Sequence, residues 1–274
     1  MAHSLPQIAI LGTGHMGGAI LGGLQQNPNS WSGIRVTSAS AATASSLAGP
    51  GVEAKSLEED AQANQWAIEG ADIIVLGVKP HYLLELLEEV APHAPASAVM
   101  VSIAAGITVA QMEAVWPGAV IRTMPNTPSQ VRHGVTGLSV GSRVSPEQRE
   151  AVVRVFETVG AVLPVEESSL NALSTFSGSG PAFVYFFIER FVEVAREHGF
   201  TPEEATTMVQ GTFAGAMELL ESSGKTPEEL REAVTSPGGT TQAALGVYEA
   251  ADLSAIIRQA SAAAIARAEE MAKD

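Results

Sequence analysis

The sequence lacks cysteine, has few aromatic residues and contains no long apolar run. Without cysteine among its 274 residues, the chain can form no disulfide, thiolate metal ligand or cysteine nucleophile, and we expect no metal site. No stretch reaches the roughly 18 consecutive apolar residues of a membrane-spanning helix. The N-terminus also lacks the basic segment and apolar run of a signal peptide. These features predict a cytoplasmic protein without a membrane partner.

Basic residues are scarce. The 15 Lys and Arg stand against 30 Asp and Glu, which gives a formal net charge of −15. Because nucleic-acid binders usually carry a basic face, we expect no nucleic-acid partner. The acidity is spread along the chain, which is typical of a solubilising surface, so an anionic ligand would need a locally positive pocket. The length suits two modest domains or one large domain.

The first 165 residues or so alternate short apolar runs with helical patterns, which favours a parallel α/β sheet. We predict strands over residues 7–11, 34–38, 71–78, 98–103 and 119–124. Several of these runs are apolar at consecutive positions, as strands covered on both faces are. A helix is predicted over 145–160, with Ser145 as N-cap, Pro146 in its first turn and Gly160 past its end.

The remaining residues form an all-helical pattern, so we predict one domain over 1–165 and a second over 166–274. The segment 180–199 is apolar nearly all round and is predicted to be a buried helix. Two further helices open on capping boxes, which begin at Thr201 and Thr226. A last helix begins near Leu253.

The glycine pattern Gly12-x-Gly14-x-x-Gly17 follows the first predicted strand and opens a helix. The first glycine permits a tight turn, the second lets the backbone approach a pyrophosphate, and Gly17 lets the helix pack on the strand. The free N–H groups of the helix start would bind the phosphates. The motif alone is weak, but its place at the start of an alternating α/β pattern predicts a dinucleotide site; the alternative is a Gly-rich turn without ligand.

The second strand indicates which dinucleotide is bound. An NAD enzyme usually has a carboxylate at the end of this strand, but none occurs between Ile34 and Gly51. Ser38 and Ser40 could donate hydrogen bonds to a 2′-phosphate, and the only basic residue nearby is Arg35. We therefore favour NADP, with NADPH preferred and NADH possible.

Other candidate residues follow the later strands. Lys79 lies at the rim of the expected crevice; the alternative is a solvated loop cation. The loop 122–129 holds Asn126 between two prolines, where its amide could face the cofactor. Two Gly/Ser-rich loops, at 174–187 and 235–245, precede helices of the second domain and indicate a substrate pocket between the domains.

The motifs together resemble those of the Δ1-pyrroline-5-carboxylate reductase family. The matching stretches are GTGHMGGAI, VKP, SIAAGIT, MPNTP, SGSGPAF and SPGGTTQAAL, in the family's order and over nearly the whole chain. The resemblance implies a Rossmann-type doubly wound parallel sheet followed by an all-helical dimerisation domain. It also implies a homo-oligomer, either a dimer or a pentamer of dimers, and hydride transfer from NAD(P)H to the cyclic imine of pyrroline-5-carboxylate, giving L-proline.

The loop SPGGTT suits a small anionic imine. Its amides at Gly238, Gly239, Thr240 and Thr241 lie at a helix start, an anion site that needs no Arg or Lys. The resemblance implies that Thr241 is the catalytic hydroxyl beside the imine nitrogen and that Ser236 helps to bind the substrate. Because threonine is a poor acid, Thr241 is interpreted as a positioning donor, and an iminium protonated by solvent is the alternative.

The resemblance also implies the remaining site residues. The cofactor would be lined by Leu11, Gly12, Thr13, Gly14, His15, Met16, Ser38, Asn64, Val78, Lys79, Pro80, Ile103, Ala104 and Ala105, to which the sequence pattern adds Gly17 and Asn126. Glu167 would lie near the substrate or the cofactor end. The chain departs from the family at Asn171 and Ser174, where Asp and Thr are common, and it lacks the basic residue often found after the second strand in NADP-preferring members.

Three other functions are alternatives. A β-hydroxyacid dehydrogenase would carry a catalytic lysine after its second glycine motif, and SGSGPAFVYFFIE has none. An F420-linked NADP reductase would not need the Gly/Thr loop of the helical domain. A non-catalytic NADP-binding regulator would keep GTGHMGG but would gain nothing from SPGGTT.

Overall fold

The computed structural model describes residues 5–271 of the chain. Contacts divide the chain into two compact units: one runs to Ser179 and includes the end of the chain from Ile265, and the other is Gly180–Ala264. We call them the sheet unit and the helical unit. The predicted boundary at residue 165 stays a prediction.

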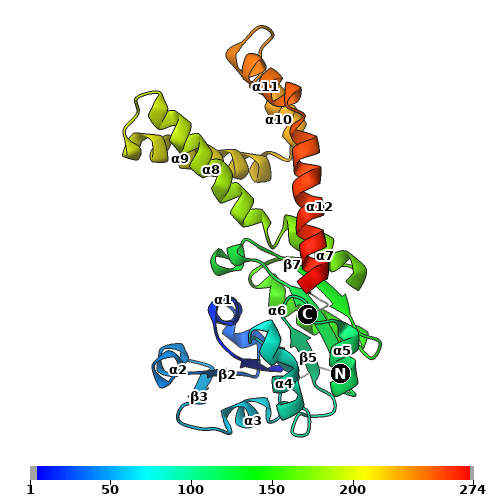
Figure 1. Cartoon of the computed structure of the whole chain (residues 1–274). Coiled ribbons are helices and arrows are strands. Elements are labelled where there is room, and N and C mark those ends of the chain that lie inside the picture. Colours follow the sequence, from blue (N-terminus) through cyan, green and yellow to red (C-terminus); the bar gives the residue numbers. More distant parts are fainter. Residues whose placement is uncertain (1–4, 272–274) are drawn as a thin grey trace. The chain divides into compact units, whose positions relative to one another are not determined.

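The sheet unit is built on an eight-stranded sheet with the order β3-β2-β1-β4-β5-β6-β7-β8 (Figure 1). The strands are β1 Gln7–Leu11, β2 Gly33–Ser38, β3 Val52–Ser56, β4 Ile73–Leu76, β5 Val99–Ser102, β6 Ala119–Met124, β7 Gly134–Val140 and β8 Gly160–Pro164. All neighbours are parallel except β6 and β7. The chain winds outward from β1 in one direction and from β4 in the other, so the order reverses between these two strands, which is the doubly wound arrangement.

Helices cover both faces of this sheet. They are α1 His15–Leu24, α2 Ala41–Leu47, α3 Ala63–Ile68, α4 Pro80–Val90, α5 Val109–Val115, α6 Pro146–Glu157 and α7 Leu170–Phe176, with short 3₁₀ turns η1 Pro28–Ser30, η2 Thr127–Val131 and η3 Glu167–Ser169. Alternate residues of β1 face opposite layers: Ile8 and Ile10 pack with α1 and α6, whereas Ala9 and Leu11 pack with α3, α4 and α5. The consecutive apolar positions in the sequence therefore reflect a sheet buried on both sides.

The helical unit contains α8 Gly180–Glu197, α9 Pro202–Ser223, α10 Pro227–Ala233, α11 Thr240–Ala250 and most of α12 Leu253–Met271. The helices α8 and α9 form a hairpin in which the rings of Phe191 and Phe213 meet edge to face at 5.6 Å. Capping boxes at Thr201 and Thr226 begin α9 and α10. Both capping boxes confirm their predictions from the sequence.

Most elements predicted from the sequence are present in the structure. The five predicted strands are found, and Ser145 caps α6. Gly160 lies past the end of that helix, as predicted, and begins β8 with φ +144°, where a Cβ atom would collide with the backbone of Gly134. The segment 180–199 is helical, but its predicted burial is wrong for the single chain, because no residue of α8 is buried. Apolar residues in a sequence indicate a surface that is buried by packing. They do not indicate whether the packing surface belongs to the same chain or to another.

Candidate functional site

The glycine loop between β1 and α1 has the geometry of a phosphate cradle. Gly12 has φ +88°, a conformation that other residues rarely adopt. A Cβ atom on Gly17 would lie 2.6 Å from the Gly12 carbonyl oxygen, whereas one on Gly14 would meet nothing within 4 Å. The space in front of Gly14 is therefore open, and Gly17 permits the tight return of the helix. Gly77, after β4, was missed in the sequence although a Cβ atom there would also collide with the Gly12 carbonyl.

The amides of this loop fit a diphosphate. The N–H groups of Gly12 and Thr13 both donate to the Thr37 carbonyl, at 3.2 and 3.0 Å, and so fix the loop against β2. The next amides, of Gly14, His15 and Met16, have no acceptor within residues 5–271. Unpaired N–H groups at a helix start attract phosphate through hydrogen bonds and the helix dipole, so the loop supplies the donors that a dinucleotide requires.

The other predicted cofactor residues lie after β2, β4 and β5, at the same carboxyl edge as the glycine loop. Val78, Lys79 and Pro80 follow β4, and Lys79 is the exposed N-cap of α4. Ile103, Ala104 and Ala105 follow β5. The carboxyl edge at the point where the strand order reverses is where open α/β sheets bind their ligands.

The end of β2 is more crowded than the sequence indicated. The Ser38 hydroxyl is buried and donates to the Ser40 carbonyl at 2.8 Å, while the Ser40 hydroxyl accepts from the amide of Thr43 and caps α2. Glu58, which follows β3, reaches the same place: its carboxylate accepts a hydrogen bond from the Ala41 amide at 2.9 Å. This carboxylate was missed because it lies 17 residues further along the chain.

Asn64 and Asn126 are both buried and bonded within the protein. Asn64 accepts from the Thr37 hydroxyl at 2.9 Å and donates to Glu89 at 3.3 Å. Asn126 donates to the Ser177 carbonyl at 2.9 Å and accepts from the Val135 amide at 2.8 Å. These bonds give both side chains a structural task, and their predicted contact with the cofactor stays a prediction.

Glu167 is held by two groups from distant parts of the sheet unit. One of its carboxylate oxygens accepts from the Arg122 guanidinium at 3.0 Å and from the Val109 amide at 2.8 Å. Arg122 lies on β6 and is buried. It was missed in the sequence, because a charged residue inside an apolar strand gives no local sign of its partner. The pair fixes the start of η3 against the sheet.

The loop between α10 and α11 differs in one respect from its prediction. Gly238 has φ +70°, and its amide donates to the side-chain carbonyl of Gln242 at 2.7 Å. The Gly239 amide donates to the Ser236 carbonyl at 2.9 Å. The four successive free amides expected here are therefore reduced to those of Thr240 and Thr241, which have no acceptor among the described residues. Gln242 was missed because its side chain reaches backward over the loop.

Thr241 lies in the first turn of α11 and is partly exposed. Its hydroxyl has no hydrogen-bond partner in the described part of the chain. The two free amides and this hydroxyl lie on consecutive residues, so a carboxylate and a neighbouring nitrogen atom of one small molecule can be bound there together.

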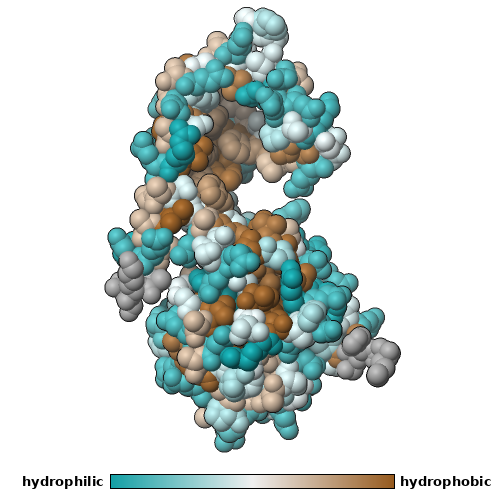
Figure 2. Space-filling model, turned by 90° about the vertical axis from the view of Figure 1, so that its right-hand side faces the viewer, coloured by the Kyte–Doolittle hydropathy of each residue, from teal (hydrophilic) through white to brown (hydrophobic). Residues whose placement is uncertain are grey.

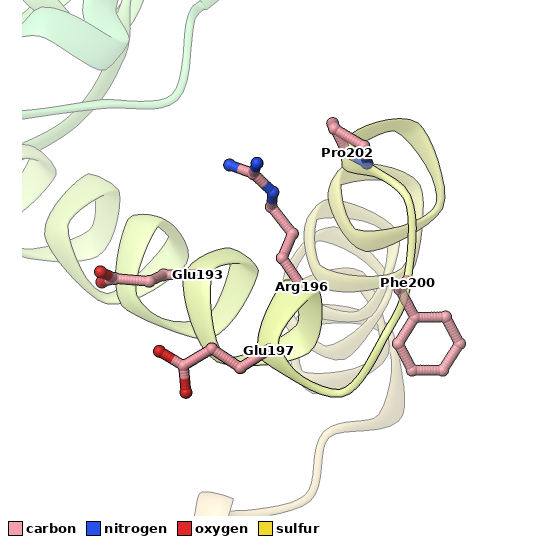
Figure 3. A pocket seen from close by; sticks show the side chains of 5 residues that line it. All are labelled: Glu193, Arg196, Glu197, Phe200 and Pro202. Carbon is pink, nitrogen blue, oxygen red and sulfur yellow. The ribbon is translucent and has the colours of Figure 1, made fainter.

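Two surface hollows contain none of these residues. One of about 390 Å³ lies in the helical unit at the turn from α8 to α9, where Figure 3 shows Arg196, Glu197 and Phe200 pointing in different directions. The other, of about 370 Å³, lies beside Trp66 in the sheet unit. Within residues 5–271, no helix is long and apolar enough to cross a membrane and no cluster of three or more metal-ligating side chains occurs.

Comparison with known families divides the chain in two. A family model described as "Pyrroline-5-carboxylate reductase dimerisation" matches residues 167–271. A second, described as "NADP oxidoreductase coenzyme F420-dependent", matches residues 7–106. The second match contains the glycine loop and the ends of β2, β4 and β5, and the first contains the loop before α11.

Relatives match the full length. A pyrroline-5-carboxylate reductase of Pseudomonas aeruginosa is 34% identical over 98% of both chains, and one of Corynebacterium melassecola is 35% identical over 97% of this chain and 98% of its own. The solved structure of a pyrroline-5-carboxylate reductase from Coxiella burnetii is 32% identical, with a TM-score of 0.90, covering 98% of this chain and 99% of the other. A prephenate dehydrogenase from A. aeolicus shares only the fold, at 16% identity and a TM-score of 0.53.

Proposed function

The chain belongs to the pyrroline-5-carboxylate reductase family, and from this premise we propose that it reduces the cyclic imine of 1-pyrroline-5-carboxylate to L-proline, the last step of proline biosynthesis. The observation that carries the proposal is similarity to reductases of this name over both units and nearly the whole length. The enzyme is an NAD(P)H-dependent oxidoreductase that acts on a CH–NH bond.

The cofactor is NADP(H), which supplies a hydride when bound. The family match over residues 7–106 supports this assignment. The glycine loop fits the diphosphate, because the amides of Gly14, His15 and Met16 have no acceptor in the described part of the chain and the space before Gly14 is open. We propose that the residues after β4 and β5, from Val78 to Pro80 and from Ile103 to Ala105, line the rest of the dinucleotide.

For the substrate we propose the loop before α11. The free amides of Thr240 and Thr241 bind the carboxylate, and the hydroxyl of Ser236 contributes a further donor. The bonds from Gly238 to Gln242 and from Gly239 to Ser236 hold the loop in the shape that exposes these two amides. A neutral loop suits an acidic protein, since no cation must be buried to attract the anion.

Thr241 orients the imine. Its hydroxyl, which has no partner within residues 5–271, can donate a hydrogen bond to the ring nitrogen. This bond makes the adjacent carbon more electrophilic and fixes the face exposed to hydride. Because threonine is a poor acid, the proton either passes through this hydroxyl or is already on the imine when it binds, taken up from solvent. Glu167, fixed by Arg122, is proposed to lie near the substrate or the cofactor end.

The helical unit makes the enzyme a homo-oligomer. The family model that matches it is described as a dimerisation region, and Figure 2 shows apolar residues, in brown, gathered on its exposed surface. The exposed aromatic residues of α8 include Phe183, Phe186 and Phe187. We further propose that dimers assemble into a pentamer of dimers and that the enzyme works in the cytoplasm.

A steady-state assay tests the reaction. The purified full-length chain is mixed with pyrroline-5-carboxylate and either NADPH or NADH. The loss of absorbance of the reduced nicotinamide is followed together with the formation of proline. Proline should form in equal amounts with the cofactor oxidised. Binding of NADPH without turnover would favour the regulator instead, and a kcat/KM for NADH equal to that for NADPH would overturn the NADPH preference.

A further inference from the structure

The ribose end of the cofactor site has an unexpected charge. The segment from Ser38 to Ala41 joins the end of β2 to the start of α2, where doubly wound folds choose between a ribose hydroxyl and a 2′-phosphate. It contains no Arg or Lys. The hydroxyls of Ser38 and Ser40 are already bonded within the segment and its neighbour Thr43, and the amide of Ala41 is bonded to the Glu58 carboxylate at 2.9 Å. A negative charge therefore lies where a 2′-phosphate would need donors.

The position of Glu58 follows from the pairing of β2 and β3. Ser38 pairs with Ser56, and the amide of Leu57 donates to the Ser38 carbonyl at 2.9 Å, so the chain leaving β3 passes directly beside the end of β2. The next acidic residues turn elsewhere: Glu59 bonds to the Ser56 hydroxyl and Asp60 to Lys55. Only Glu58 of this acidic run bonds to the β2–α2 segment among the described residues.

We propose that Glu58 sets the cofactor selectivity of this reductase, an inference that rests on the proposed function. Its carboxylate accepts the hydrogen bond of the Ala41 amide, which a 2′-phosphate would otherwise receive. The carboxylate also repels the negative charge of that phosphate, and both effects weaken NADPH binding at the ribose end. The same carboxylate can accept a hydrogen bond from a 2′-hydroxyl, as the acidic residue of NAD-binding folds does. Glu58 thus takes the place of the carboxylate that the end of the second strand lacks. It reduces the affinity for NADPH relative to that for NADH.

A purely structural role for Glu58 predicts a different result. A carboxylate at the start of α2 stabilises the helix through its dipole and its bond to the amide. Loss of that stabilisation would destabilise the whole β2–α2 segment and weaken the binding of NADPH and NADH by the same factor. If Glu58 sets selectivity, its substitution must change the affinities for NADPH and NADH in opposite directions or by clearly different factors. The ratio of the two affinities therefore separates the two roles.

The test compares ligands that report only on the adenosine end. Calorimetry on the full-length chain measures the dissociation constants of adenosine 2′,5′-bisphosphate and adenosine 5′-monophosphate. The variant is Glu58→Gln, whose side-chain carbonyl can still accept from the Ala41 amide. The control is Glu53→Gln, which removes the same charge near the start of β3, where Glu53 pairs with Arg35 at 3.7 Å. Each variant removes one negative charge, Glu58→Gln beside the β2–α2 segment and Glu53→Gln near the start of β3.

We expect Glu58→Gln to tighten the bisphosphate about fivefold, the size of one screened charge–charge repulsion at short range, and to leave the monophosphate unchanged or weaker. The NADPH-to-NADH affinity ratio should rise by the same factor, and Glu53→Gln should change neither. Equal changes for both ligands, or a ratio altered less than twofold, would overturn the proposal. Wild-type protein that binds neither cofactor would refute the proposed function itself, so the two failures are distinguishable.

Discussion

The two units bury their apolar residues in opposite ways. In the sheet unit, β1, β4 and β5 are enclosed by helices on both faces, and Ile8, Ile74 and Phe156 are 0% exposed. In the helical unit, Phe186 is 56% exposed and Phe183 and Phe187 are each 41% exposed, and only Ala205 and Val209 are buried in α9. The sheet unit is therefore complete as a single chain, whereas the helical unit needs a second surface.

The chemistry is divided along the same line. The glycine loop and strand ends that suit the cofactor belong to the sheet unit, and the Gly/Thr loop that suits the substrate belongs to the helical unit. A substitution in the sheet unit should therefore affect stability or cofactor binding. A substitution in the helical unit should affect subunit assembly or turnover. Four predictions test this division, from the largest effect to the smallest.

Substitution in the sheet core should strongly destabilise the protein. Phe156→Ala removes a fully buried ring on α6, and the resulting cavity should lower the free energy of unfolding by about 3–5 kcal/mol. Chemical denaturation followed by circular dichroism measures the loss. The matched control is Phe186→Ala, which removes the same ring from an exposed position and should change the stability of the separated chain by under about 1 kcal/mol. Equal losses would erase the difference between the units.

Substitution on the helical surface should separate the subunits. Phe183 and Phe187 are one turn apart on α8 and share a face. The double variant Phe183→Ser/Phe187→Ser should weaken self-association by about a hundredfold or more, since buried interface aromatics contribute about 2 kcal/mol or more each. Sedimentation velocity over a range of concentrations detects the change, and circular dichroism checks that the helices persist. A compact, active wild-type monomer would contradict the interpretation.

Loss of the Thr241 hydroxyl should lower turnover. Thr241→Val keeps the shape of the side chain and removes the proposed donor to the imine, so kcat should fall about a hundredfold, as on removal of one donor from a reacting centre. The dissociation constant of NADPH should not change, because that site belongs to the sheet unit. Thr240→Val is the control and should mainly raise KM or leave the kinetics unaltered. Unchanged turnover in Thr241→Val would remove the assigned role.

The smallest effect is a difference in acid sensitivity. Hydrogen bonds from Lys55 and then from the Gln62 amide lower the pKa of Asp60 below its ordinary value of 3.8. The Thr201 amide and hydroxyl lower the pKa of Glu204 below 4.5. Because both pKa values fall on folding, both groups stabilise the protein above their unfolded values and lose that effect as the pH drops below them.

Asp60→Asn and Glu204→Gln should each flatten the loss of stability below about pH 4.5, where these carboxyl groups begin to take up protons. Because Asp60 pairs with a cation, its contribution should shrink in high salt, whereas that of Glu204, which bonds to neutral donors, should not. Denaturation curves from about pH 3 to 7, at low and high salt, measure both. Identical salt responses would show that the two carboxyl groups are stabilised in the same way.

Local signals in the sequence predicted much of this molecule. The capping boxes at Thr201 and Thr226, the N-cap at Ser145 and the glycine loop are all set by residues within a few positions of one another. Strands covered on both faces were visible as apolar runs. The strands β3, β7 and β8 were missed: β3 and β7 mix polar or glycine residues with apolar ones, and β8 is largely exposed.

The unpredicted site residues act over long distances. Glu58 reaches Ala41, and Arg122 reaches Glu167 across 45 residues. Neither partner could be identified without the strand order and register. The exposure of α8 was mispredicted for a related reason, because the surface that would cover it is not part of the same chain. Sequence periodicity identified the apolar face but could not identify its partner.

The order of the sheet strands and of α8 along the chain has a consequence for synthesis. The last strand of the sheet ends at Pro164, and the first helix of the helical unit begins at Gly180. A ribosome therefore releases every strand of the sheet before the aromatic face of α8, and domains made first can fold first. The newly made helices then expose apolar side chains until another copy arrives. Neighbouring ribosomes on one messenger would shorten that interval, and scarce expression would lengthen it.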